Sequence, residues 1–346
     1  MRVGVLGTGQ VGGSILLGLR ALPHVTASAW DADPATRSLL IAAGVDVADP
    51  ADLLTCDVLV LALPTPAALA WLADPPPGCT ALVTDACSVT GALAAAAHPR
   101  LRHVGGHPMA GTEGSGWTSA RSDMFTGAPW ALVVDDPALV PQDWLDVAGL
   151  VTGLGARVIP VGAQAHDEAV GLVSHLPHVL TAAYGDTLTR AEDDLALVLG
   201  ASSFDDFTRV STSPGQRTAD LLWHNRAAVR AWVAAFRESL DRVERTLDEV
   251  DGAAFAGLFT QAGAARRRRD ARRQRWCEPA TPVFRGQPAD CLGWLRAQGP
   301  GSVAIAHIED AGAGGPAGAG GPAGAGGPAG AARDREVTLW GWRFDR

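Results

Sequence analysis

The residues of this 346-residue chain that are most able to do chemistry lie in two histidine-containing stretches. His107 follows two glycines and precedes a proline in "VGGHPMAGTEGSG", a composition that fits neither an amphipathic helix nor an ordinary strand. The unperturbed pKa of histidine, about 6.5, suits it to accept a proton near neutral pH. In "SHLPH", a helix would group Ser174, His175 and His178 on one side, and Pro177 should disturb that helix. We expect a site at these residues rather than histidines that serve packing alone.

The composition excludes several other chemistries. All 28 basic residues are arginine, so no lysine can act as a base, a Schiff-base nucleophile or a P-loop phosphate ligand. The five cysteines are scattered without a CxxC pair, so we expect no disulfide, no metal site and a reducing, cytoplasmic location. The net charge of −9 argues against nucleic acid as a partner. No apolar run reaches about 18 residues and the chain opens directly with a strand, so we expect neither a membrane span nor a signal peptide.

The beginning of the chain has the pattern of a dinucleotide-binding loop. The apolar strand "RVGVL" is followed by a GxGxxG sequence that opens a helical pattern, which is the context that this motif requires. The first glycine allows a tight turn, the second lets a pyrophosphate approach the backbone, and the third lets the helix pack against the strand. A glycine-rich turn without a ligand is the alternative. The expected cofactor-binding residues of the loop are Gly7, Thr8, Gly9, Gln10, Val11 and Gly12.

Further cofactor contacts are expected at the carboxyl ends of the next strands. Asp31 follows the strand "VTASAW" and stands 19 residues after Gly12, where an acid can bind both ribose hydroxyls and repel a 2′-phosphate. We therefore expect NAD in preference to NADP, although Arg37 offers a contact to a 2′-phosphate, and a cap or turn is the other role open to Asp31. Two further buried strands, "DVLVLALPTP" and "TALVTDACSV", place Pro64 and Asp85 beside the cofactor.

The order of elements predicts an α/β Rossmann-type dinucleotide-binding domain followed by an all-α domain. Residues 1–162 alternate strands with helices, and the strands at 130–134 and 156–161 are expected to complete its sheet, with a helix of about 12 residues between them. From residue 163 the apolar period becomes 3.6, which predicts a helical domain over 163–276. Seven arginines crowd positions 266–275, and we interpret them as a solvated helix end rather than an RNA-binding segment.

Residues 277–346 are expected to form a small C-terminal α+β appendage whose fold the sequence leaves open. Its segments "TPVFRG", "PADCLGWLRAQG", "SVAIAHIED" and "REVTLWGWRF" predict strand, helix, strand and strand. This order is similar to the first half of an ACT regulatory domain, which binds an amino acid, so both a sensor and a purely structural appendage stay open. The repeated "GGPAGA" within 311–332 predicts a disordered loop.

Residues 1–265 resemble the prephenate dehydrogenase family of tyrosine biosynthesis, which includes arogenate-using relatives. The resemblance is carried by "GTGQVGGS", "TDACSV", "VGGHPMAGTEGSG", "SHLPH" and "FTRV", in this order. The family converts prephenate and NAD to 4-hydroxyphenylpyruvate, NADH and carbon dioxide. Hydride leaves the ring carbon that bears the hydroxyl, and loss of the carboxylate on the opposite carbon makes the ring aromatic. Such an enzyme needs an acceptor for the hydroxyl proton, anchors for two carboxylates and a positioned nicotinamide.

The resemblance implies a role for each matching residue. His107 accepts the hydroxyl proton, Ser88 hydrogen-bonds the same hydroxyl, and Arg209 binds a substrate carboxylate with its forked guanidinium. Glu113 pairs with Arg209 at the mouth of the pocket. Thr90 stands where relatives often have lysine, so any attraction of anions by that lysine is absent. The expected substrate contacts besides Arg209 are His178, Ser174, His175, Glu113 and Thr112.

Several alternatives stay open at this stage. Prephenate and arogenate differ only in a keto or amino group, and no motif decides between them, so an arogenate dehydrogenase that gives tyrosine directly is one alternative. A non-catalytic NAD-binding sensor is another. The β-hydroxyacid dehydrogenases share the two-domain plan, but their catalytic lysine is missing from this chain. The resemblance further implies that the helical domain binds substrate and forms a homodimer, and that tyrosine is a candidate feedback inhibitor.

Overall fold

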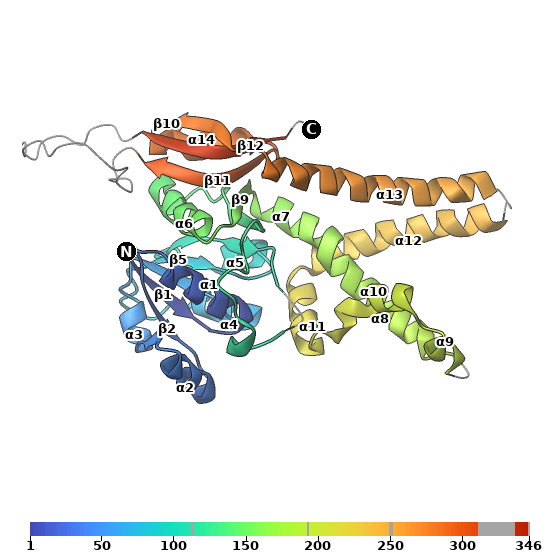
Figure 1. Cartoon of the computed structure of the whole chain (residues 1–346), viewed down its shortest axis with the longest axis horizontal. Coiled ribbons are helices and arrows are strands. Elements are labelled where there is room, and N and C mark those ends of the chain that lie inside the picture. The colour runs from blue at the N-terminus through green and yellow to red at the C-terminus, as the bar shows by residue number, and fades with distance from the viewer. Residues whose placement is uncertain (112–113, 192–193, 249–251, 311–335, 345–346) are drawn as a thin grey trace, which may run out of the picture.

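The structure is a computed structural model of the chain, and it describes residues 1–111, 114–191, 194–248, 252–310 and 336–344. Its elements form two six-stranded sheets and a group of helices that extends away from them (Figure 1). The expected fold class, a Rossmann-type domain followed by helices, is confirmed.

The first sheet is parallel throughout and has the strand order β3-β2-β1-β4-β5-β6. This is an order of the doubly wound dinucleotide-binding fold, in which ligands bind beyond the carboxyl ends of the strands. The strands are β1 (Arg2–Leu6), β2 (Thr26–Trp30), β3 (Asp46–Val47), β4 (Val58–Leu61), β5 (Leu82–Asp85) and β6 (Arg102–Val104). The helices between them are α1 (Gln10–Arg20), α2 (Pro34–Ala42), α3 (Pro50–Leu53), α4 (Thr65–Ala73) and α5 (Gly91–Ala96).

The starts of two of these helices differ in a way that matters for ligands. Asp33 caps α2 by accepting hydrogen bonds from two backbone N–H groups of the first turn, and Pro34 occupies the first helical position. At α1, by contrast, Gly9 is the N-cap residue, and no side chain among the described residues caps the helix. The partial positive charge of this helix start therefore stays available to an anion.

The second sheet joins segments from distant parts of the chain in the order β10-β12-β11-β9-β8-β7. The strands near 130–134 and 156–161 belong to it, so the expectation that they complete the first sheet is wrong. After β6 the chain turns into a strand that pairs antiparallel with β8, and the outer side of β9 pairs with β11. The strands are β7 (Gly106–Pro108), β8 (Pro129–Val133), β9 (Arg157–Val161), β10 (Thr281–Gly286), β11 (Val303–Asp310) and β12 (Val337–Arg343). The helices that pack on this sheet are α6 (Pro141–Gly153) and α14 (Pro288–Ala297).

One hydrophobic core connects the two sheets and the C-terminal segment. Trp144 of α6 is completely buried and belongs to the same cluster as Ile15 of α1, Leu292 of α14 and Ile305 of β11. The predicted order of strand, helix, strand and strand in the C-terminal segment is confirmed. This segment continues the sheet that carries His107 instead of standing apart from it. The glycine-rich repeat that was expected to be disordered lies outside the described residues.

The helical part begins with a continuous helix that contains a π-helical turn. Pro177 lies in the first turn of the segment after it, and a proline inside a helix removes a backbone hydrogen bond and clashes with the preceding turn. The wider π turn absorbs that clash, so it is the disturbance expected from Pro177. The elements are α7 (Ala163–Val170), the π turn (Gly171–His175), α8 (Leu176–Leu188), α9 (Leu195–Val198), α10 (Ser202–Thr208), α11 (Gly215–His224), α12 (Arg226–Asp248) and α13 (Gly252–Gln274). Short 3-10 turns lie at Trp117–Ser119, Arg209–Thr212 and Arg275–Cys277.

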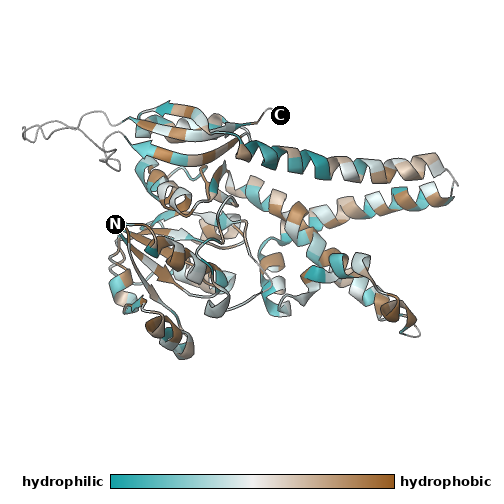
Figure 2. Cartoon of the chain, viewed as in Figure 1, coloured by the Kyte–Doolittle hydropathy of each residue, from teal (hydrophilic) through white to brown (hydrophobic). Residues whose placement is uncertain are grey.

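Helices α12 and α13 form a long antiparallel hairpin that projects from the sheets (Figure 1). Val229 is the buried residue of α12, and the described part of α13 has none. Leu240, Leu247 and Phe259 of the hairpin are exposed, and hydrophobic and hydrophilic residues mix along it until α13 becomes hydrophilic near the sheet (Figure 2). None of the helices in the described ranges is both long and apolar enough to span a membrane.

Candidate active site

The loop between β1 and α1 fits a dinucleotide pyrophosphate. Gly7 has a φ of +89°, and a β carbon there would lie 2.6 Å from a backbone carbonyl oxygen after β4. A β carbon at Gly12 would collide with the carbonyl oxygen of Gly7, so only glycine allows α1 to pack this closely. A β carbon at Gly9 would meet nothing within 4 Å. This open space faces the first turn of α1, which begins with Gln10 and Val11.

Asp31 is fixed to this loop from the end of β2. Its Oδ2 accepts hydrogen bonds from Thr8 N (2.6 Å) and Thr8 Oγ1 (2.9 Å), and its Oδ1 accepts one from Asp33 N (3.0 Å). The guanidinium of Arg37 donates to the backbone oxygen of Asp31 at 2.6 Å and lies 5.4 Å from the centre of the Trp30 ring. Asp31 thus lies just after the end of β2, beside the glycine-rich loop, and its predicted contact with the ribose stays a prediction.

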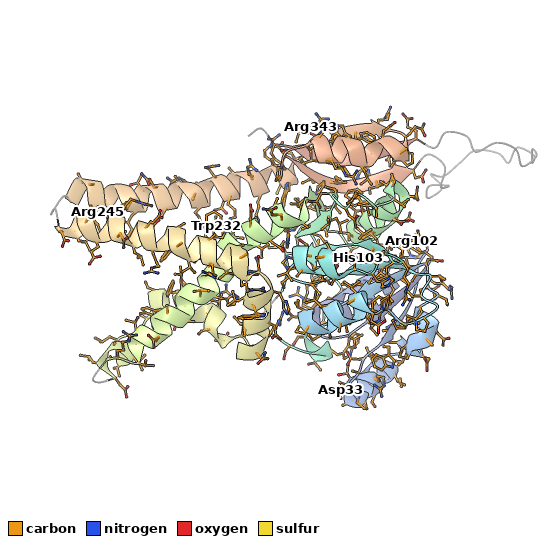
Figure 3. All side chains as sticks on the ribbon, turned by 180° about the vertical axis from the view of Figure 1, so that it is seen from behind. Asp33, Arg102, His103, Trp232, Arg245 and Arg343 are labelled. Atoms are coloured by element: carbon orange, nitrogen blue, oxygen red, sulfur yellow. The ribbon has the colours of Figure 1, made fainter. Side chains whose placement is uncertain are left out.

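The other residues predicted to contact the cofactor follow β4 and β5. Asp85 has a completely buried carboxylate that bonds His103 Nε2 of β6 at 2.9 Å (His103 is labelled in Figure 3) and Cys87 N at 3.0 Å. A role of Asp85 toward the cofactor would therefore act through the loop that it holds. Ser88 is half-buried in that same loop, and Pro64 is exposed where α4 begins.

Strand β7 places His107 against the end of the first sheet. Gly106 makes this approach possible, because a β carbon there would lie 2.9 Å from the backbone oxygen of Asp85. His107 is 9% exposed, and its Nδ1 lies 2.9 Å from His166 Nε2. Its Nε2 makes no hydrogen bond with any described residue. Burial, with smaller contributions from neighbouring histidines, lowers the pKa of His107 to about 3, so the imidazole is neutral at pH 7.

His166 and Asp167 of α7 connect His107 to the start of α5. His166 Nδ1 lies 2.8 Å from Asp167 Oδ1 and 3.1 Å from Thr90 Oγ1. The carboxylate also accepts hydrogen bonds from Thr90 N and Gly91 N, both at 2.9 Å. Burial alone would raise the pKa of Asp167, but the hydrogen bonds from His166 and the two backbone groups outweigh it, so this pKa lies below its usual value. Thr90 thus helps to hold an ionised carboxylate.

The π turn ends in His175, which is 1% exposed. Asn225, between α11 and α12, donates from Nδ2 to the backbone oxygen of Asp167 (2.7 Å), and the same Nδ2 lies 3.0 Å from His175 Nδ1. Because an amide N–H can only donate, His175 Nδ1 accepts and the ring proton is on Nε2. Burial lowers the pKa of His175 to about 4 although the charge of Asp167 opposes this. The Nε2–H group is buried without a partner in the described part of the chain, so it can donate to a ligand.

His178 lies one turn further along, in α8, near two arginines. Burial lowers its pKa, and the charges of Arg209 and Arg217 lower it further, so both guanidinium groups lie close to this imidazole. Arg209 begins the 3-10 turn after α10, and Arg217 belongs to α11. Ser174 is half-buried in the π turn. Two guanidinium groups suit a substrate with two carboxylates.

The structure groups four of the predicted site residues. A positive charge on His175 would act on His107, one on His178 would act on His175, and the charge of Arg209 acts on His178. Thr112 and Glu113 lie outside the described residues, and so does the expected pair of Glu113 with Arg209. No group of three or more acidic, histidine or cysteine side chains suited to a metal occurs among the residues that the structure describes.

The sequence interpretation missed the residues that hold these groups in place. His166 and Asp167 stand at the start of the same helical pattern as "SHLPH", where a histidine beside an aspartate is an ordinary surface pair. The only available signal was this His-Asp dipeptide directly before an apolar helix that already carried three polar site candidates. The missed residues are His166, Asp167, Asn225 and Arg217.

Comparisons with known proteins agree with this geometry. Residues 19–160 match the model of the nucleotide-binding domain of prephenate dehydrogenase, and residues 162–261 match the model of the dimerization domain of prephenate dehydrogenase. A curated prephenate dehydrogenase from Lactococcus lactis subsp. cremoris is 28% identical over 278 residues, which cover 74% of each chain.

Solved structures give the same result. The prephenate dehydrogenase from A. aeolicus, in complex with hydroxyphenyl propionate and NAD+, is 25% identical with a TM-score of 0.72, over 78% of this chain and 98% of that chain. The arogenate dehydrogenase from Synechocystis is also 25% identical, with a TM-score of 0.66, over 78% of this chain and 99% of that chain. Because these two adjoining family models together match residues 19–160 and 162–261, which is more than half of the chain, the chain belongs to the prephenate dehydrogenase family.

Proposed function

We propose that this chain catalyses the NAD-dependent oxidative decarboxylation of prephenate to 4-hydroxyphenylpyruvate, a reaction of tyrosine biosynthesis. One observation carries the proposal: His107 is buried and neutral, bonded through Nδ1, and its Nε2 makes no bond with the described residues. A base in this state can take the hydroxyl proton as hydride leaves the same carbon. Membership of the family supplies the reaction class.

The proposed cofactor is NAD, which accepts the hydride when bound. The glycine-rich loop leaves room for the pyrophosphate at Gly9. The carboxylate of Asp31, fixed by Thr8, would bind the ribose and repel a 2′-phosphate, which favours NAD over NADP. Arg37 already donates to a backbone oxygen and lies over Trp30, so it is committed to this turn rather than to a phosphate.

The proposed roles of the substrate-binding residues follow their positions. Ser88 orients the hydroxyl beside His107, and Arg209 binds one carboxylate. The buried Nε2–H of His175 donates to a substrate oxygen. The further substrate contacts that we propose are His178, Ser174, Thr112 and Glu113.

The proposal is tested by mixing the purified chain with NAD and prephenate and following NADH absorbance. We expect turnover with the wild type. In His107→Asn we expect kcat to fall by about 10²–10⁴-fold with a modest change of KM, because the base is lost and the binding groups stay. Arg209→Ala should mainly raise KM. If these two effects were interchanged, the assigned roles would be wrong.

The same assay with arogenate, and with NADP in place of NAD, settles the choice of substrate and cofactor. The similarity to the Synechocystis arogenate dehydrogenase makes arogenate the second candidate substrate. Prephenate and arogenate differ only in a keto or an amino group. A difference between their kcat/KM values would therefore show which of these two groups the binding site prefers. Absence of turnover with both would support a non-catalytic NAD-binding sensor and remove the enzyme proposal.

We further propose that the chain works as a homodimer in the cytoplasm. The match to a dimerization domain and the exposed Leu240, Leu247 and Phe259 of the α12–α13 hairpin support the dimer. The five free cysteines suit a reducing compartment. Light scattering gives the mass in solution, and tyrosine added to the assay tests feedback inhibition.

A further inference from the structure

A chain of hydrogen bonds leads from His107 to a cavity at α7. It passes from His107 Nδ1 to His166 Nε2 (2.9 Å), and from His166 Nδ1 to Asp167 Oδ1 (2.8 Å). Asp167 lines a cavity of about 890 Å3 together with Glu168 of α7 and Trp232 of α12. Trp232 marks the place where α12 meets α7, because its Nε1 donates to the backbone oxygen of Glu168 at 2.8 Å (Figure 3). The cavity lets solvent reach one end of a chain whose other end is a buried base.

Asp167 determines which nitrogen of each imidazole carries the proton. Its carboxylate is held ionised by the backbone N–H groups of Thr90 and Gly91, and a carboxylate can only accept. His166 therefore carries its proton on Nδ1 and donates it to Asp167, which leaves His166 Nε2 as an acceptor. His107 must then donate its own Nδ1–H to that acceptor. The lone pair of His107 Nε2 is left for the substrate.

We propose that His166 and Asp167 are a positioning pair, which fixes the reactive tautomer of His107 and holds on His166 a proton taken from His107 during hydride transfer. This inference rests on the proposed function. When the substrate O–H bond breaks, an N–H bond forms at His107 Nε2, and the proton on His107 Nδ1 passes to His166 Nε2. The hydride goes with its electron pair to the cofactor.

The proton returns by the same path, so the histidine pair ends the reaction with the same number of protons as at the start. When the ring carboxylate leaves as carbon dioxide, the electron pair of its bond to the ring makes the ring aromatic and its oxygen a phenolate. His107 Nε2 gives the proton to that oxygen and regains one from His166 at Nδ1. The oxidative decarboxylation of prephenate to a phenol releases no net proton, so a group that holds one proton and returns it is what the reaction requires.

The charges around the two rings favour His166 as the holder. A protonated His166 has the ionised Asp167 at 2.8 Å, whereas His107 has no carboxylate bonded to it among the described residues. A positive charge on buried His107 would be desolvated without a counter-charge in contact. Besides His166 and Asp167, the groups that act electrostatically on the imidazoles of this site are two cationic arginines, Arg209 and Arg217, and two histidines, His175 and His178, which carry no negative charge in either protonation state.

The experiment compares the pH profiles of Asp167→Asn and Glu168→Gln in the full chain. Glu168 is the matched control, because it is the next residue of α7 and lines the same cavity but makes no bond to His166. Asp167→Asn should lower kcat by about 10²-fold with KM within about threefold, because the proton-accepting step loses its support. The acid limb of kcat/KM should move to lower pH, since loss of the negative charge weakens proton binding by the histidine pair. Glu168→Gln should match the wild type.

A purely structural role of Asp167 would lower activity without moving the acid limb, and that result would overturn the proposal. An Asp167→Asn effect no larger than that of Glu168→Gln would overturn it as well. The tautomers can be measured without a turnover assay. Long-range ¹H–¹⁵N correlation spectra of the wild type labelled at histidine report which ring nitrogen carries the proton. We expect the Nδ1–H form for both His107 and His166, with His166→Gln used to assign the signals. An Nε2–H form of either ring would reject the inference even if the enzyme turned out to use another substrate.

Discussion

At the scale of single residues, burial rather than paired charge sets the state of the central histidines. His107 and His175 lose proton affinity because both are removed from water, and each is held by one hydrogen bond to Nδ1. The two bonds have opposite senses, since Asn225 donates to His175 whereas His107 donates to His166. One histidine is therefore prepared as a proton acceptor at Nε2 and the other as a donor at Nε2. The residue types were predictable from the sequence, but these opposite tautomers were not, because they depend on partners that are distant in sequence.

Buried neutral histidines make the folded state sensitive to acid. The pKa values of about 3 for His107 and about 4 for His175 lie below the unfolded value of about 6.5. The unfolded chain therefore binds protons first, and the free energy of unfolding falls as the pH drops from about 6.5 toward about 4, by up to about 1.4 kcal/mol per unit for each histidine. Urea unfolding at several pH values should show a smaller slope for His175→Gln than for the wild type. His24→Gln, at an exposed histidine, should keep the wild-type slope, and equal slopes in all three chains would contradict this account.

Arg217 is a candidate anchor for the second substrate carboxylate. It lies close enough to His178 for its charge to lower the pKa of that ring, as Arg209 does. Arg217→Ala should raise KM for prephenate by about tenfold with little change of kcat, because a charged hydrogen bond to the bound substrate is lost. Arg190→Ala is the matched control, since Arg190 is an exposed arginine of the same helical part that pairs with Asp186. An unchanged KM in Arg217→Ala would remove this role.

At the scale of elements, the two turns around the site differ in how far the sequence reveals them. The loop from β1 to α1 is predictable, because GxGxxG after an apolar strand is typical of a tight turn that leads into a closely packed helix. The π turn was predictable only as a disturbance at Pro177. A proline in a helix removes one backbone hydrogen bond, but the sequence does not show at which turn the helix widens in response. The structure places it at Gly171–His175, where a β carbon on Gly171 would lie 3.1 Å from side chains of α12. Close packing against α12 thus helps to define where the helix widens.

The glycine-rich loop can be tested by two glycine variants with opposite expected results. Gly9→Ala places a methyl group in open space, so the fold should be unchanged while the Kd for NADH rises by about tenfold, because that space is where the pyrophosphate approaches the backbone. Gly12→Ala forces a methyl group against the oxygen of Gly7, so it should destabilise the fold by about 1–3 kcal/mol or more. Thermal unfolding and titration of NADH fluorescence separate the two effects. Wild-type affinity in Gly9→Ala would mean that the cofactor does not bind against this loop.

At the scale of the whole molecule, the chain returns at its C-terminal end to the sheet that carries the proposed base. The pairing of Ile305 with Val158 joins strands that are about 150 residues apart, and no local pattern predicts such a neighbour. The strands themselves were predictable from their apolar and β-branched residues, so the order of elements along the chain was predicted correctly. Which sheet each strand joins was not, because that depends on neighbours that are distant in sequence. Residues 262–346 lie outside both family models, so this sheet extension cannot be taken from the family. It follows that β9 is an inner strand here, with β8 on one side and β11 on the other.

If the shared core makes the C-terminal segment part of one cooperative unit, damage to its sheet should weaken the whole molecule. In Gly341→Ala the new methyl group would collide with the backbone oxygen of Ala304 between β11 and β12, at a cost of about 1–3 kcal/mol. Calorimetry should then show a single transition at a Tm lower by a few degrees, with activity lost in that same transition. Gly293→Ala is the control, since this exposed helical position has nothing within 4 Å and alanine there should leave the Tm equal or higher. A separate early transition in Gly341→Ala, with activity retained above it, would show instead that the C-terminal strands unfold independently and that the sheet around His107 does not depend on them.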